Sequence, residues 1–178
     1  MAARKPKALE AAELEALAAK LLQARALSTG ELRERLRRRA ANAADVEPIL
    51  AKFRQLGFLD DRKFAEAFAS ARLESKGMGK ARVLRDLLGR RVAGSLARKT
   101  VDAAFEGVEE TALIEAFLAR KFRHVDLAEF LAEEKNLAAA YRKLRYAGFS
   151  RGNSIRVLKQ YSVRAEALEE AGEEPDSD

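Results

Sequence analysis

The feature that most constrains this chain is the spacing of its apolar residues. They recur at intervals of three and four positions along almost the whole sequence, which places them on one face of successive α-helices, and no sustained two-residue alternation of the strand type occurs. The nine stripes lie at 14–21, 32–36, 46–56, 64–71, 83–88, 96–105, 113–118, 137–144 and 155–158. This pattern predicts an all-α fold of three tandem three-helix repeats.

The proposed repeats begin near Glu13, Asp60 and Glu109, at intervals of 47 and 49 residues, within the range of helical repeat proteins. A helix trio of this size buries too little surface to be stable alone, so we expect an elongated, curved array of stacked repeats. Segment 123–135 is expected to be a loop or an extension of the helix after it. The expected organisation is a flexible basic N-terminus at 1–12, repeats at 13–58, 59–108 and 109–162, and an acidic tail at 163–178.

Start and stop signals support this division. Ser28 and Glu31 have the spacing of a capping box, in which the hydroxyl accepts from the N3 amide and the carboxylate reaches back to the N-cap amide. Asp60 predicts a second capped start. Gly57 and Gly148 each follow an apolar stripe and precede a Phe, as a glycine in the left-handed conformation does at a helix C-terminus.

Charge is distributed unevenly along the chain. There are 34 Lys and Arg against 28 Asp and Glu, and seven of the acidic residues follow Arg164, where no basic residue occurs. Without this tail the net charge rises from +6 to +13. A body this basic favours a polyanionic partner, although many single charges simply solvate helix faces. The tail is most simply a solvated segment; the alternative is that it folds back as a phosphate mimic.

Several classes of protein are excluded. The chain has no Cys, which rules out disulfides, thiolate zinc sites and a cysteine nucleophile. No apolar run approaches the roughly 18 residues of a membrane helix, and Glu10 and Glu13 interrupt the segment after the basic N-terminus. We therefore expect a cytoplasmic protein without a membrane partner. His124 lacks a second His or any Cys, so no metal site is expected.

Two apparent catalytic motifs fail on inspection. Residues 77–80 read GMGK, but Glu74 and Ala81 stand where a phosphate-binding loop needs Gly and Ser or Thr. Asp60 and Asp61 are adjacent, and neighbouring helical side chains diverge by about 100°, so capping explains them better than catalysis. No nucleophile with a base, metal box or dinucleotide fingerprint is found. The chain is predicted to be no enzyme and to need no cofactor.

Residues 56–68, which read LGFLDDRKFAEAF, resemble the central signature of the RecX family. Upstream, Ser28, Glu31 and Leu32 are similar to its first repeat, and residues 77–83, GMGKARV, are similar to its second-repeat element. The resemblance covers about 14–161. Departures are Lys80 in place of the usual Pro, a missing Gly at residues 91–92, and residues 146–147, YA, where paired basic residues are frequent.

The resemblance implies a regulator of RecA recombinase, acting in DNA recombination, DNA repair and the SOS response. Such a protein lies in the groove of the RecA filament and inhibits strand exchange and ATPase activity or promotes filament disassembly. The expected partner is RecA on single-stranded DNA, with weak direct DNA binding. The chain is expected to act as a monomer.

Basic residues are the candidate binding residues because each repeat has a basic middle helix. Arg33 and Arg37 lie one turn apart, opposite the stripe of Leu32 and Leu36, so one face can present both. Similar repetition along an array would match the regular spacing of a polymer. The candidates are Arg33, Arg37, Arg38, Lys80, Arg82, Arg85, Arg142, Lys143, Arg145, Arg151 and Arg156.

An alternative is a DNA- or RNA-binding helical module without sequence specificity. Three-helix units can place a helix in a major groove, and the body of the chain is strongly basic. Few aromatic residues interleave with the arginine clusters, so stacking on unpaired bases is poorly provided for. This interpretation is therefore the weaker one as a sole function.

Overall fold

The structure is a computed structural model that describes residues 8–166. Within that range the only β-type pairing is an isolated parallel bridge between Leu9 and Ala40, so the predicted all-α fold is confirmed. The α-helices are α1 (Ala11–Ala24), α2 (Thr29–Arg37), α3 (Val46–Gln55), α4 (Asp61–Glu74), α5 (Lys80–Gly89), α6 (Gly94–Ala104), α7 (Glu110–Lys121), α8 (Leu127–Ala132), α9 (Glu134–Tyr146) and α10 (Arg151–Lys159). Two short 3₁₀ helices are η1 (Ala43–Asp45) and η2 (Val163–Glu166).

The chain forms two compact units. Unit 1 comprises Met1–Phe68 and Asp86–Thr100, and unit 2 comprises Ala69–Arg85 and Val101–Asp178. The division passes through α4, α5 and α6, the three helices of the second repeat, so each of them contributes residues to both units.

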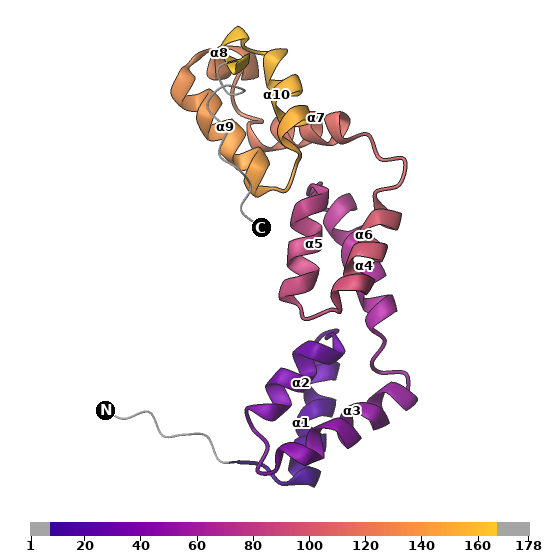
Figure 1. Cartoon of the computed structure of the whole chain (residues 1–178). Coiled ribbons are helices and arrows are strands. Elements are labelled where there is room, and N and C mark those ends of the chain that lie inside the picture. The colour runs from indigo at the N-terminus through magenta and orange to yellow at the C-terminus, as the bar shows by residue number, and fades with distance from the viewer. Residues whose placement is uncertain (1–7, 167–178) are drawn as a thin grey trace, which may run out of the picture. The chain divides into compact units, whose positions relative to one another are not determined.

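The first trio, α1, α2 and α3, packs around the core of unit 1 (Figure 1). Its apolar stripes meet as predicted, because residues three and four positions apart share a helix face. The buried members are Leu14, Ala18, Leu27, Leu32, Leu36, Val46, Ile49, Leu50, Phe53 and Leu59. These side chains give the first repeat its own core.

The predicted helix starts in unit 1 are confirmed. The hydroxyl of Ser28 accepts from the Glu31 amide at 3.0 Å, and the Glu31 carboxylate accepts from the Ser28 amide at 3.4 Å. Asp60 caps α4 by accepting from the Lys63 amide at 3.0 Å. The glycine at the end of α3, Gly57, is left-handed at φ +76°. Local capping chemistry therefore set these boundaries.

The third trio consists of α7, α9 and α10 and lies in unit 2 with α8 (Figure 1). Its core contains Ile114, Phe117, Leu118, Leu131, Leu137, Ala140, Leu144, Ala147, Phe149, Val157, Leu158 and Ala165. Segment 123–135 is neither a loop nor an extension of the next helix, which corrects both expectations. Asp126 caps the separate helix α8 through the Glu129 amide at 3.0 Å, and the extended conformation of Glu133 separates α8 from α9.

Other expectations about organisation are not tested. The elongated, curved arrangement and the repeat boundaries stay predictions. The predicted basic N-terminus and acidic tail lie mostly outside the described residues. Of those two segments, the structure describes the bridge at Leu9, the first residues of α1 and the 3₁₀ helix η2.

Candidate functional site

The start of α5 docks on the turn that ends α9, a contact within unit 2 that we call the α5–α9 junction. The Gly79 amide donates to the Ala147 carbonyl at 2.9 Å, and the Ala81 amide donates to the Gly148 carbonyl at 3.2 Å. Gly148 is left-handed at φ +89°, and a Cβ there would lie 2.2 Å from the Arg82 backbone nitrogen. A Cβ on Gly79 would lie 2.4 Å from the Gly148 oxygen. Only glycine at both positions permits this approach.

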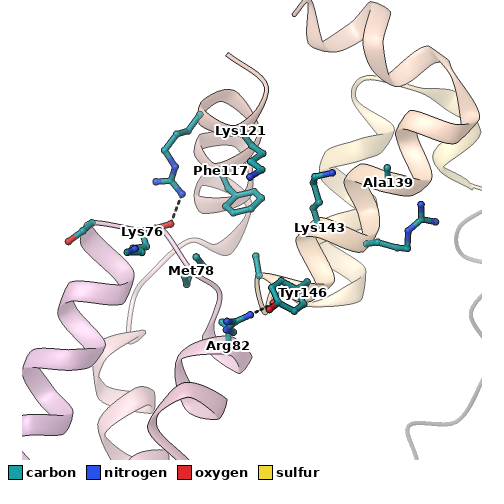
Figure 2. A pocket seen from close by; sticks show the side chains of 12 residues that line it. Lys76, Met78, Arg82, Phe117, Lys121, Ala139, Lys143 and Tyr146 are labelled. Atoms are coloured by element: carbon teal, nitrogen blue, oxygen red, sulfur yellow. Dashed lines mark hydrogen bonds between the residues drawn. The ribbon is translucent and has the colours of Figure 1, made fainter. Parts of the chain in front are cut away.

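Beside this junction lies a pocket of about 770 Å³ (Figure 2). Its lining comes from the segment between α4 and α5, the start of α5, helices α7 and α9, and the turn after α9, all in unit 2. Basic side chains dominate its polar lining, and no carboxylate lines it among the described residues. Its six basic residues, which define what we call the basic pocket, are Lys76, Arg82, Arg120, Lys121, Arg142 and Lys143.

Two aromatic residues contribute to the wall of the basic pocket. The Arg82 guanidinium lies 4.5 Å from the centroid of the Tyr146 ring, and Tyr146 is 68% exposed. Phe117 is buried against Phe149 in an edge-on contact with centroids 5.5 Å apart. Figure 2 shows Phe117 and Tyr146 on different helices that line the pocket. The pocket therefore combines positive charge with apolar and aromatic surface.

Two of the six cations are held in place by backbone carbonyls. Arg120 donates to the Lys76 carbonyl, and Arg82 donates to the Tyr146 carbonyl at 3.4 Å (Figure 2). The side chains of Lys121, Arg142 and Lys143 are exposed and form no ion pair or hydrogen bond with any residue in the range 8–166. The pocket therefore presents positioned guanidinium groups beside cations that are available to an external anion.

The structure brings three of the candidate residues together, because Arg82, Arg142 and Lys143 all line the basic pocket. The other candidates of unit 2 lie elsewhere. Lys80 pairs with Asp102 at 2.8 Å, and Arg145 donates to the Phe149 carbonyl at 2.7 Å. The remaining three, which the pocket lining does not include, are Arg85 on α5 and Arg151 and Arg156 on α10.

The candidate residues of the first repeat are paired within unit 1. Glu47 accepts from Arg33 at 2.7 and 3.1 Å and lies 3.5 Å from Arg37. The hydrogen bond with Glu47 raises the pKa of Arg33, and the same bond lowers the pKa of Glu47. Arg38 pairs with Glu34 one turn before it, at 2.8 Å. The basic face of α2 is thus largely neutralised by carboxylates of its own unit.

Three cations of the pocket were missed by reasoning from the sequence. Lys76 follows α4, and Arg120 and Lys121 end α7, whereas most of the predicted candidates lie on the middle helices of the repeats. The sequence does show these basic residues near helix C-termini, where Lys and Arg are common because they interact favourably with the helix dipole. Nothing in that local signal indicates that these helix ends meet α9.

The described residues also bear on metal binding, on His124 and on membrane spans. Among residues 8–166, no three or more His, Asp or Glu side chains come together in a way that could hold a metal ion. His124 accepts a hydrogen bond from its neighbour Arg123 at 2.9 Å. None of the helices from α1 to α10 is both long and apolar enough to cross a membrane.

Comparison with known proteins identifies relatives along most of the chain. Residues 60–101 match the family model described as RecX, second three-helix domain. A protein of Streptomyces coelicolor named Regulatory protein RecX is 29% identical over 163 residues, covering 91% of this chain and 81% of the relative. One of Thermus thermophilus with the same name is 33% identical over 145 residues, covering 80% and 88%.

Solved structures agree in fold. The crystal structure of RecX from Lactobacillus salivarius superposes with a TM-score of 0.64 at 13% identity, covering 85% of this chain and 96% of that one. A second crystal structure, of a regulatory protein RecX, gives 0.60 at 18% identity, covering 83% and 70%. With the sequence match to the Thermus thermophilus protein, these findings show that the chain belongs to the RecX family of regulatory proteins.

Proposed function

We propose that this protein regulates a RecA recombinase without catalysing a reaction, by binding the RecA filament on single-stranded DNA through the basic pocket. The observation that carries the proposal is the clustering of six cations in a pocket that no carboxylate of the described range 8–166 lines. A nucleoprotein filament is a polyanion, and positive potential focused in a concave surface attracts such a partner. Inhibition then follows from occupying the filament groove, or from favouring disassembly.

The test compares two double variants of equal charge change. Arg142→Glu with Lys143→Glu reverses two neighbouring cations of the pocket on α9, neither of which pairs with a carboxylate of residues 8–166. The control, Arg98→Glu with Lys99→Glu, reverses two neighbouring exposed cations on α6 in unit 1. Arg145 is avoided because its bond to the Phe149 carbonyl supports the turn after α9.

We expect the pocket variant to bind RecA filaments at least about tenfold more weakly in co-sedimentation, because reversed charges repel the polyanion. Its inhibition of RecA ATPase activity should fall in parallel, while the α6 control should stay near the unaltered protein. Equal inhibition by both double variants would remove the basic pocket from the proposed function.

A second candidate function is direct binding of DNA or RNA. The observation in its favour is the exposed Tyr146 ring beside cations, since aromatic rings stack on unpaired bases. A titration separates the two functions. Bare DNA that binds as tightly as the filament, with a steep loss of affinity as salt rises, would favour the nucleic-acid module.

A further inference from the structure

The lining of the basic pocket is not that of a simple charged surface. Six cations share it with apolar side chains, among them Met78 and the buried ring of Phe117. A ligand that satisfies both parts must carry several negative charges and a flat apolar body in one molecule. Inorganic anions and peptides of glutamate or aspartate alone have only the first of these properties, whereas a phosphorylated nucleoside combines both in one small molecule.

Tyr146 provides a place for such a flat body. The Arg82 guanidinium lies over the ring at 4.5 Å from its centroid, and Tyr146 nevertheless remains 68% exposed. One face of the ring is therefore covered by the guanidinium and the other is open. An aromatic face of this kind stacks with a nucleobase of any identity, because every base has a π-face.

The cations that could hold phosphate groups lie around this ring. Lys143 precedes Tyr146 by three residues on α9, so the two share one helix face, and Arg142 lies four residues before it. Arg82 and Arg120 are oriented by their bonds to backbone carbonyls, which reduces the entropy lost when a guanidinium binds an oxyanion. Figure 2 shows the side chains of Arg82, Lys143 and Tyr146 in the same lining.

From this arrangement we propose that the basic pocket binds one phosphorylated nucleoside, with its base stacked on the open face of Tyr146 and its phosphates among the cations. This inference rests on the proposed function for the choice of pocket, and it adds the chemical class of the ligand. A volume of about 770 Å³ lies within the range of pockets for small ligands and cofactors. The phosphorylated nucleoside is either a free nucleotide or one nucleotide of a strand.

The experiment titrates the full chain alone, without recombinase, so that it is independent of filament binding. Four probes are measured by calorimetry: ATP, inorganic triphosphate, a short single-stranded oligonucleotide and a glutamate-rich peptide. ATP binding identifies a free nucleotide as a source, and oligonucleotide binding without ATP binding identifies a strand. Failure of both nucleotide probes overturns the inference, whereas the proposed function fails separately, in co-sedimentation with filaments.

Two variants separate stacking from charge. Tyr146→Leu keeps an apolar side chain at an exposed position and removes the ring, so we expect about tenfold weaker binding of the nucleotide probe and unchanged binding of triphosphate. Arg142→Gln with Lys143→Gln should weaken both probes, and the α6 control Arg98→Gln with Lys99→Gln should weaken neither. Nucleotide binding that is indifferent to Tyr146→Leu, or peptide binding as tight as nucleotide binding, overturns the inference.

Discussion

Unit 1 contains a junction that is built like the α5–α9 junction of unit 2 but differs in charge. In this α2–α5 junction, the start of α2 meets the turn that ends α5, where the Ser28 hydroxyl donates to the Arg90 carbonyl. At the equivalent place in unit 2 a backbone amide, that of Gly79, donates to the Ala147 carbonyl at 2.9 Å. Each junction therefore joins the first turn of one middle helix to the last turn of the next.

The charge difference falls at equivalent helix positions. Ser28 precedes α2 and Gly79 precedes α5. The residues three and six positions after Ser28 are Glu31 and Glu34, whereas those three and six positions after Gly79 are Arg82 and Arg85. Both glutamates pair with arginines of the facing turn, Arg90-Arg91, at 3.1 and 3.8 Å. In unit 1 the two glutamates form ion pairs across the junction. In unit 2 arginines stand at both positions, and one of them, Arg82, lines the basic pocket beside the junction. The two junctions thus share a backbone arrangement and differ in the sign of the charge at equivalent positions.

The largest expected effect tests the shared backbone arrangement. Gly148→Ala should destabilise unit 2 by about 3 kcal/mol, because a left-handed alanine and a clash with the Arg82 backbone add together. The measurement is denaturant unfolding followed by circular dichroism. Gly57→Ala is the matched control, since Gly57 is also left-handed but has open space around its Cβ direction, and should cost about 1 kcal/mol. Equal costs would show that the close approach in the α5–α9 junction contributes nothing.

A smaller effect tests the charge difference. Glu31→Gln should cost about 1 kcal/mol, because the Glu31 side chain is only 12% exposed and pairs with Arg25 and Arg90. Arg82→Gln, at the equivalent position of α5, should change stability by less than about 0.5 kcal/mol, since it removes a contact with an exposed ring and a long hydrogen bond, 3.4 Å, to the Tyr146 carbonyl. Unfolding free energies of the two variants give the comparison. A larger cost for Arg82→Gln would contradict the assignment of stability to one junction and binding to the other.

The smallest effect concerns pH. Burial raises the pKa of Glu110, but hydrogen bonds from Ser150 and Asn153 and the charge of Arg145 outweigh it and hold the pKa below its ordinary value. The stabilisation is therefore present above the ordinary glutamate pKa and is lost as pH falls through the lowered one. Glu110→Gln should flatten the loss of unit 2 stability in acid, measured as melting temperature against pH.

Glu47 provides the matched control in unit 1. Its hydrogen bond with Arg33 lowers its pKa, so Glu47→Gln should flatten the acid dependence in the same direction. Because this ion pair lies at the surface, we expect its effect to disappear in high salt. The effect at Glu110 should persist, since its bonds come from Ser150 and Asn153, which are uncharged. If high salt abolished the effect of Glu110→Gln as well as that of Glu47→Gln, the hydrogen bonds to Glu110 would not be the cause of its lowered pKa.

Much of the helical architecture could be predicted because its signals are local. The capping box of Ser28 and the left-handed Gly57 and Gly148 depend on residues within one turn of each helix end. The end of α5 was less readable, because Arg91 takes the left-handed conformation at φ +58° without being glycine. Its contact with Gly30 across the α2–α5 junction supports that conformation, and no sequence pattern near Arg91 indicates it.

The sequence by itself determined every described α-helix except α8, the caps at Ser28, Asp60, Gly57 and Gly148, and the excess of positive charge, since periodicity and capping act over a few residues. Only the tertiary structure decided which charges remain available. Glu47 lies 14 residues from Arg33 and neutralises it, whereas Arg82 and Tyr146, 64 residues apart, meet through the close approach of two glycines. Pairing of this kind depends on which helices come together in space, which packing within a repeat decides for Arg33 and packing between repeats decides for Arg82.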